Sequence, residues 1–160
     1  MIAQIRGYRR DDEDTVVALA LRAWAPVFVS EEQVLGREIF VRLHGDWREY
    51  QEKSVRETLA NNAMRVWVAE AERRVVAFVA ATLHVERAIG EIWMVAVDPD
   101  DQGLGVGTAL TEFVTAWLRD SGMRVAMVET GGDTGHAPAR RVYEKADYTL
   151  SPVARYFKAL

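Results

Sequence analysis

The stretch EIWMVAVDPDDQGLGVG, residues 91–107, carries the strongest structural signal of the chain. Its first part, residues 91–97, is apolar almost throughout, which is typical of a central strand covered on both faces. After the glycines, apolar side chains recur at spacings of three and four, which is the pattern of one helix face. They are Val106, Leu110, Phe113, Val114, Trp117 and Leu118. The stretch therefore predicts a strand, a glycine-rich loop and a helix that ends at Gly122.

The segments that follow extend this pattern. Residues 125–130 form a predicted strand, and strand, crossover helix and strand in that order imply a parallel pair with a right-handed connection. The glycine-rich sequence at 131–135 leads into a helix with Ala139, Val142, Tyr143 and Ala146 on one face. Residues 152–160 are predicted to form a last strand.

The N-terminal half has a different order of elements. A short strand over residues 3–8 precedes a helix whose first turn carries Asp11, Asp12 and Asp14. Residues 30–60 have a helical pattern broken near residues 44–46, and residues 64–68 with the run from Val75 predict a hairpin that ends at Gly90. We expect an α/β fold with a mixed sheet, in which antiparallel N-terminal strands and a central parallel pair are flanked by helices.

Length and charge limit the classes of function. A chain of 160 residues predicts a single domain, residues 1–160. The 20 basic and 24 acidic residues give a net charge of −4 without a polybasic run, which argues against nucleic acid as a partner. Apolar stretches are too short for a membrane span, so we expect no membrane partner and a cytoplasmic location. No cysteine occurs and the three histidines lack ligand spacing, so no metal is expected.

The glycine-rich loop suggests phosphate binding. Glycines let backbone N–H groups point inward, and a helix N-terminus adds partial positive charge. Glycines at positions 1, 3 and 6 would mark a dinucleotide site, but counting from Gly103 or Gly105 gives Thr108 or Leu110 at the sixth position. The loop has no lysine, so it is not a P-loop.

The string does resemble the signature of the GNAT superfamily of N-acetyltransferases, in which Gln/Arg-x-x-Gly-x-Gly/Ala follows a strand ending in Val-x-Pro. Gln102, Gly105 and Gly107 match the loop, and Val97 and Pro99 match the strand end. A second segment, Ala139-x-x-x-Tyr-Glu-Lys-x-Asp-Tyr148, is similar to the family's Ala-x-x-x-Tyr-Glu-Lys-x-Gly-Phe. The chain departs from the family at His136, where Asn is usual, and at Asp147, where Gly is usual.

The resemblance implies an acetyl-CoA site and no metal. It places the pyrophosphate on the loop amides and the pantetheine arm along the strand, and Asp100 and Asp101 would oppose the phosphates unless they point to solvent. The implied cofactor-binding residues are Val95, Ala96, Val97, Gln102, Gly103, Leu104, Gly105, Val106, Gly107, Thr108, His136 and Tyr143.

The resemblance also implies catalytic residues. Glu91 stands eleven residues before Gln102, where the histone acetyltransferase branch has its glutamate base, and Glu129 is the competitor on the neighbouring strand. Tyr143 is the candidate proton donor to the departing thiolate. The expected function is acetyl transfer to the primary amine of a small molecule, protein or peptide. The alternative is a non-catalytic acyl-CoA sensor of the same fold, and self-association into a homodimer stays open.

Overall fold

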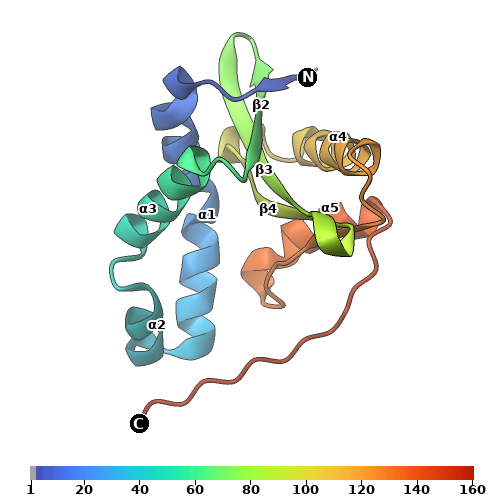
Figure 1. Ribbon diagram of the computed structural model, residues 1–160. Helices are drawn as coiled ribbons and strands as arrows, with labels where there is room; N and C mark the ends of the chain where they lie inside the picture. The colour runs from blue at the N-terminus through green and yellow to red at the C-terminus, as the bar shows by residue number, and fades with distance from the viewer. Residues whose placement is uncertain (1–2) are drawn as a thin grey trace.

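The computed structural model describes residues 3–160, and a five-stranded mixed sheet forms its centre (Figure 1). The strands follow one another across the sheet in chain order, and all neighbours are antiparallel except the last two, which are parallel. The strands are β1 (Gln4–Gly7), β2 (Arg65–Ala71), β3 (Arg74–His84), β4 (Ile89–Val97) and β5 (Val125–Val128). This arrangement confirms the expected α/β class with antiparallel N-terminal strands and a parallel pair.

Helices cover both faces of the sheet (Figure 1). They are α1 (Glu13–Leu35), α2 (Arg37–His44), α3 (Trp47–Ala60), α4 (Val106–Asp120) and α5 (Ala137–Lys145). Because side chains alternate along a strand, Phe78 packs with α1 on one face while its neighbour Val79 packs with α4 on the other. Within the described residues, no helix combines the length and the apolar character that a membrane span requires.

The helical N-terminal half differs from the prediction in its first boundary. The structure continues α1 to Leu35, so residues 30–35 belong to the first helix and not to a separate one. The helix ends at Gly36, whose φ of 78° lies in the left-handed region that glycine adopts at low cost. The second break falls at Gly45, inside the predicted interval.

Two further predictions about strands were wrong. Gly90 does not end the hairpin but lies inside β4. A Cβ atom there would overlap the side chain of Leu118, so glycine permits the close packing of β4 with α4. Residues 152–160 form no strand. They continue as an exposed, extended tail that leaves the sheet (Figure 1), because a strand requires a partner and this segment has none in the described structure.

Candidate active site

The parallel strands β4 and β5 separate halfway along β4. Their pairing covers four positions and ends where Ile92 faces Val128, whereas β4 continues to Val97. The register between β3 and β4 shifts at the same point, because Ala81 pairs with Ile92 and Ala80 with Met94. Trp93 is therefore an extra residue, and a bulge of this kind bends a strand. In the described chain, residues 94–97 of β4 have a strand partner on the β3 side only, and Trp93 is unpaired, so the other edge of residues 93–97 is free.

The free edge leads directly into the glycine-rich loop. Gly103 and Gly105 have φ angles of 75° and 85°, and a Cβ atom at either would meet nothing within 4 Å. Glycine is thus required by the backbone conformation and not by lack of space. Helix α4 begins at Val106, and the first hydrogen bond that closes a turn of it runs from Ala109 N to Gly105 O over 3.0 Å. The N–H groups of residues 106–108 consequently have no partner within the helix.

Two arginines hold the aspartates of this loop. Arg22 reaches from α1 to Asp98 at 2.8 Å and to Asp100 at 2.9 Å, and Arg74 of β3 lies 2.9 Å from Asp101. Asp101 is buried, so it does not point to solvent. The two arginines offset two of the three negative charges that would repel an anion at the loop, and one net negative charge remains.

The remaining loop residues are placed at the end of β4. The side-chain amide of Gln102 donates a hydrogen bond to Val97 O over 3.0 Å, and Leu104 is exposed. A Cβ atom at Gly107 would be in ordinary contact with Val97 at 3.6 Å and with Val142 at 3.9 Å. The last contact shows that α5 packs beside the first turn of α4, next to the loop.

Glu91 lies near the start of β4, one residue before the strands part. Its side chain is 13% exposed, and His84 Nε2 donates a hydrogen bond to its Oε2 over 2.7 Å. Across the parallel pair, Glu91 faces Met127. Glu129, the other candidate base, is the first residue after β5 and is exposed. Both glutamates thus flank the point at which the two strands separate.

Tyr143 lies on α5 and is fixed by the end of that helix. Asp147 adopts a left-handed conformation with φ of 63°, and Tyr148 N donates to Tyr143 O over 3.0 Å while Asp147 N donates to Glu144 O over 3.2 Å. This pair of bonds is a Schellman motif, so Asp147 replaces the family's glycine without loss of the helix end. Burial raises the pKa of Tyr143 to about 12, so its phenol stays protonated at neutral pH.

A polar cluster that sequence reasoning missed ties α1 to the loop after β5. The carboxylate of Asp133 lies between Ser30 Oγ of α1 and Nδ1 of His136, and Arg140 donates to the carbonyl oxygens of Gly131 and Asp133. Burial alone would raise the pKa of Asp133, but the hydrogen bonds from Ser30 and His136 outweigh it and the pKa is lowered. In the sequence, the spacing Asp133-x-x-His136 could have indicated the contact between these two side chains. No pattern in the sequence indicates the contact with Ser30.

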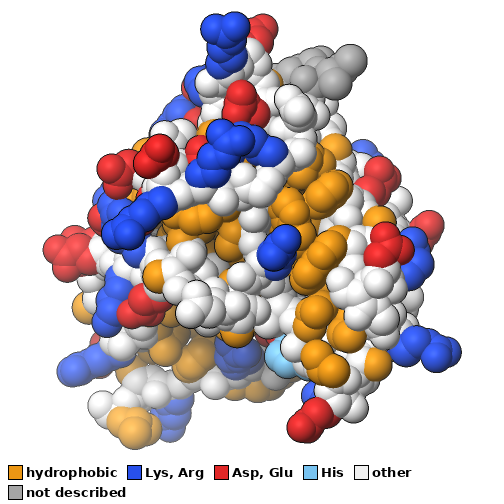
Figure 2. Space-filling model, turned by 45° about the horizontal axis from the view of Figure 1, so that its top comes forward, with side chains coloured by type: hydrophobic (Ala, Val, Ile, Leu, Met, Phe, Trp, Pro, Cys, Tyr) orange, Lys and Arg blue, Asp and Glu red, His pale blue; other side chains and the backbone are white. Residues whose placement is uncertain are grey.

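Figure 2 shows apolar side chains gathered in bands on one face of the molecule, with charged side chains around them.

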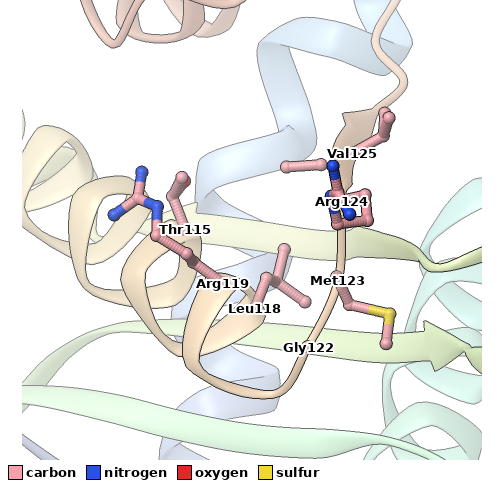
Figure 3. A pocket seen from close by; sticks show the side chains of 8 residues that line it. Thr115, Leu118, Arg119, Gly122, Met123, Arg124 and Val125 are labelled. Carbon is pink, nitrogen blue, oxygen red and sulfur yellow. The ribbon is translucent and has the colours of Figure 1, made fainter.

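A hollow of about 390 Å³ lies between the last turns of α4 and the start of β5 (Figure 3). Leu118, Arg119, Met123 and Val125 contribute to its lining. It belongs to the opposite end of α4 from the glycine loop, about 20 Å away along the helix axis, so it is not part of this site.

The site thus combines a strand with a free edge and a glycine-rich loop at a helix N-terminus, so its main-chain groups can bind an extended ligand that ends in a phosphate. Residues 31–148 match the family model described as the acetyltransferase (GNAT) family, which is most of the chain. The chain belongs to the GNAT family, and the resemblance seen in the sequence is confirmed.

Mycothiol acetyltransferases are among its relatives. The protein from Rhodococcus opacus is 30% identical over 150 residues, which cover 89% of this chain and 43% of that protein. The one from Cellulomonas flavigena is 43% identical over 65 residues, covering 41% of this chain and 18% of that protein. The chain thus spans less than half the length of these relatives.

Solved structures share the fold. The ribosomal-protein-S18-alanine N-acetyltransferase from Escherichia coli has a TM-score of 0.69 at 18% identity, with 94% of this chain and 80% of that chain covered. The PaiA N-acetyltransferase from Thermoplasma acidophilum, solved in complex with coenzyme A, has a TM-score of 0.69 at 13% identity, with 96% and 94% covered. At these identities the likeness concerns the fold alone.

Proposed function

We propose that this protein transfers an acetyl group from acetyl-CoA to a primary amine by direct attack. The observation that carries the proposal is the free edge of β4 over residues 93–97, which leads into a loop where the first N–H groups of α4 have no partner within the helix. An extended ligand with amide groups can add to such an edge as a strand would, and a pyrophosphate suits the helix N-terminus.

The residues present fit acetyl-CoA. The amides of Gly103 to Thr108, with Leu104 and Val106 between the glycines, would hold the pyrophosphate, and the main chain of Val95 to Val97 would hold the pantetheine arm. Gln102 would support the strand end through its bond to Val97 O. When bound, acetyl-CoA supplies an acetyl group activated as a thioester. Arg22 and Arg74 offset two of the three negative charges of the loop aspartates, which weakens the repulsion of the phosphates.

The amine must be neutral to attack, and an alkyl amine has a pKa of about 10.4, so a base is needed at neutral pH. Glu91 would accept this proton, with Glu129 as the competing base. A main-chain N–H of Val95 or Ala96 would stabilise the oxygen that gains negative charge. Tyr143 would donate a hydrogen bond to the departing sulfur. Because its pKa is about 12, this role is a hydrogen bond as charge develops and not complete proton transfer.

The acceptor is a cationic amine in this proposal, which suits the chain's net charge of −4. We place the protein in the cytoplasm, where such a co-substrate is available. The named relatives acetylate different molecules, so family membership alone does not select the acceptor.

A thiol-release assay with acetyl-CoA against a panel of amines tests the proposal, and calorimetry with coenzyme A is its companion. We expect binding that competes with acetyl-CoA and turnover with at least one amine. Binding without turnover on any amine would favour the non-catalytic acyl-CoA sensor. Absence of coenzyme binding would contradict both.

A further inference from the structure

The Asp133 carboxylate receives donors on both of its oxygens. Oδ2 accepts from Ser30 Oγ and from Gly135 N, the latter over 3.2 Å, and Gly135 N also lies 3.0 Å from Ser30 Oγ. Oδ1 accepts from Nδ1 of His136. The side chains of Asp133 and His136 are only 14% and 16% exposed, so water competes little for these bonds.

This arrangement fixes the tautomer of His136. An ionised carboxylate can only accept hydrogen bonds, so the imidazole proton of neutral His136 must be on Nδ1. The other ring nitrogen, Nε2, then carries a lone pair and is a hydrogen-bond acceptor. A backbone or hydroxyl partner would not impose this choice as strongly, because the bond to a charged acceptor is roughly twice as strong as a neutral one.

The cluster adjoins α5, whose Val142 lies next to Gly107 of the glycine loop. His136 is the N-cap residue of α5, and Tyr143 follows seven residues later, so the two stand on the same side of the helix about 10 Å apart along its axis. Helix α1 contacts both β4 and the turn Thr134–His136. Through Ser30 it therefore holds the loop after β5 at a set position relative to the free edge of β4.

We propose that Asp133 is a positioning residue that presents Nε2 of His136 as an acceptor to an N–H group of a bound substrate. The shared chemistry is an N–H donor, which is either an amide of the coenzyme arm or the acceptor amine. The inference rests on the proposed function and adds Asp133 and Ser30 to its site.

The substitution Asp133→Asn makes a directional prediction. Two donors, Ser30 Oγ and Gly135 N, meet at the position of Oδ2, so the amide oxygen of asparagine will occupy it. The NH2 group must then point at Nδ1 of His136, which becomes an acceptor. The ring proton moves to Nε2, and that nitrogen faces the substrate as a donor. The shape of the site changes little, but the tautomer is inverted.

The tautomer is measured by long-range proton–nitrogen NMR on protein labelled with ¹⁵N-histidine, which is tractable because the chain has three histidines. We expect the Nδ1–H form for His136 in the unmodified protein and the Nε2–H form in Asp133→Asn. The matched control is Asp46→Asn, which removes a carboxylate that caps α3 and is not in the cluster. Glu91→Gln identifies the His84 signal, since the two side chains are hydrogen bonded.

Binding is measured on the same proteins. For Asp133→Asn we expect binding to weaken roughly 10- to 100-fold, because two N–H donors, Nε2–H of His136 and that of the substrate, would face each other without an acceptor. The loss appears in the calorimetric Kd for coenzyme A if the donor is the coenzyme amide, and in the KM for the amine if it is the acceptor. The Asp46→Asn control keeps both values. These tautomer spectra need no coenzyme, so they remain interpretable even if the unmodified protein fails to bind it.

Three results would overturn the proposal. The first is an Nε2–H tautomer in the unmodified protein, and the second is an inverted tautomer in Asp133→Asn with both constants unchanged. The third comes from Ser30→Ala, which keeps the carboxylate and hence the tautomer: a loss as large as that of Asp133→Asn would assign the effect to loop anchoring. If Asp133→Asn does not fold, two variants of His136 replace it. His136→Gln retains an acceptor oxygen, whereas His136→Leu has no acceptor. The same Kd for coenzyme A and the same KM for the amine in both variants would contradict the proposal.

Discussion

Replacement of Gly105 tests whether the loop conformation itself creates the coenzyme site. Gly105 has φ of 85° and ψ of 2°, and its added Cβ atom would touch nothing within 4 Å. The cost of Gly105→Ala is therefore backbone strain alone, about 1–2 kcal/mol for an L-residue in the left-handed region. Asparagine tolerates this region better than alanine, so Gly105→Asn is expected to cost less.

The strain translates into weaker binding. If the variant relaxes the loop in the free protein, the fraction of molecules that can bind coenzyme A falls. The apparent Kd rises by the same factor by which that fraction falls. A cost of 1–2 kcal/mol corresponds to a factor of about 5–30. We expect this increase in the calorimetric Kd for coenzyme A with Gly105→Ala and a smaller one with Gly105→Asn.

Gly7→Ala is the matched control. It also adds a methyl group into open space, but its backbone needs no left-handed φ and it lies in β1, away from the loop. The control should bind coenzyme A as tightly as the unmodified protein. Equal affinity of Gly105→Ala and Gly7→Ala, at equal thermal stability, would refute the reasoning that the left-handed backbone is required.

Other predictions concern the candidate base, the candidate donor and a structural ion pair. Glu91→Gln should lower kcat roughly 100-fold with little change in coenzyme Kd; if only Glu129→Gln does so, the base is the residue that follows β5. Tyr143→Phe should lower kcat roughly 10- to 1000-fold. Because the pKa of Tyr143 is about 12, this residue does not titrate below pH 10, and the pH–rate profile of Tyr143→Phe should keep the shape of the unmodified protein's profile in that range. If the variant lost an alkaline limb below pH 10, Tyr143 would be titrating there, which contradicts its role as a phenol that stays protonated. Asp12 accepts two bonds from Arg6, which lower its pKa, so Asp12→Asn should cost about 1–3 kcal/mol of unfolding free energy at pH 7. A lowered folded-state pKa stabilises above the unfolded value of about 3.9, so the difference in denaturant midpoints should shrink below pH 4; a constant difference would contradict this.

The elements that could be predicted are those whose signal is local. The apolar face of α4 follows from spacing, and Val106, Leu110, Val114 and Leu118 are indeed buried. The glycine-rich loop also followed from the same stretch, whereas the left-handed conformation of Gly103 and Gly105 was seen only in the structure. The helix end at Asp147 was also accessible, because aspartate tolerates a left-handed backbone.

Features that depend on contacts distant in sequence could not be predicted. Residues 152–160 have a strand-like composition, but strand formation depends on a partner that local pattern does not reveal. The bulge at Trp93 lies within an uninterrupted apolar run, so nothing in residues 91–97 marks where the strands part. Ser30 and Asp133 are separated by 103 positions, and only the fold brings them together.

Strand β4 packs into the core with its side chains and, in the proposed function, binds the coenzyme with its main chain, and this separation affects which substitutions the protein tolerates. Val95 and Val97 send their side chains into the core beneath α4, and Ala96 sends its side chain into the core beneath α1. The proposed contacts to the coenzyme use only the main chain of these same residues. Substitutions that preserve the packing would therefore leave recognition intact, and sequence drift at these positions is limited by core volume alone. The acceptor side of the site can then diversify across relatives while the coenzyme side keeps its geometry under many different sequences.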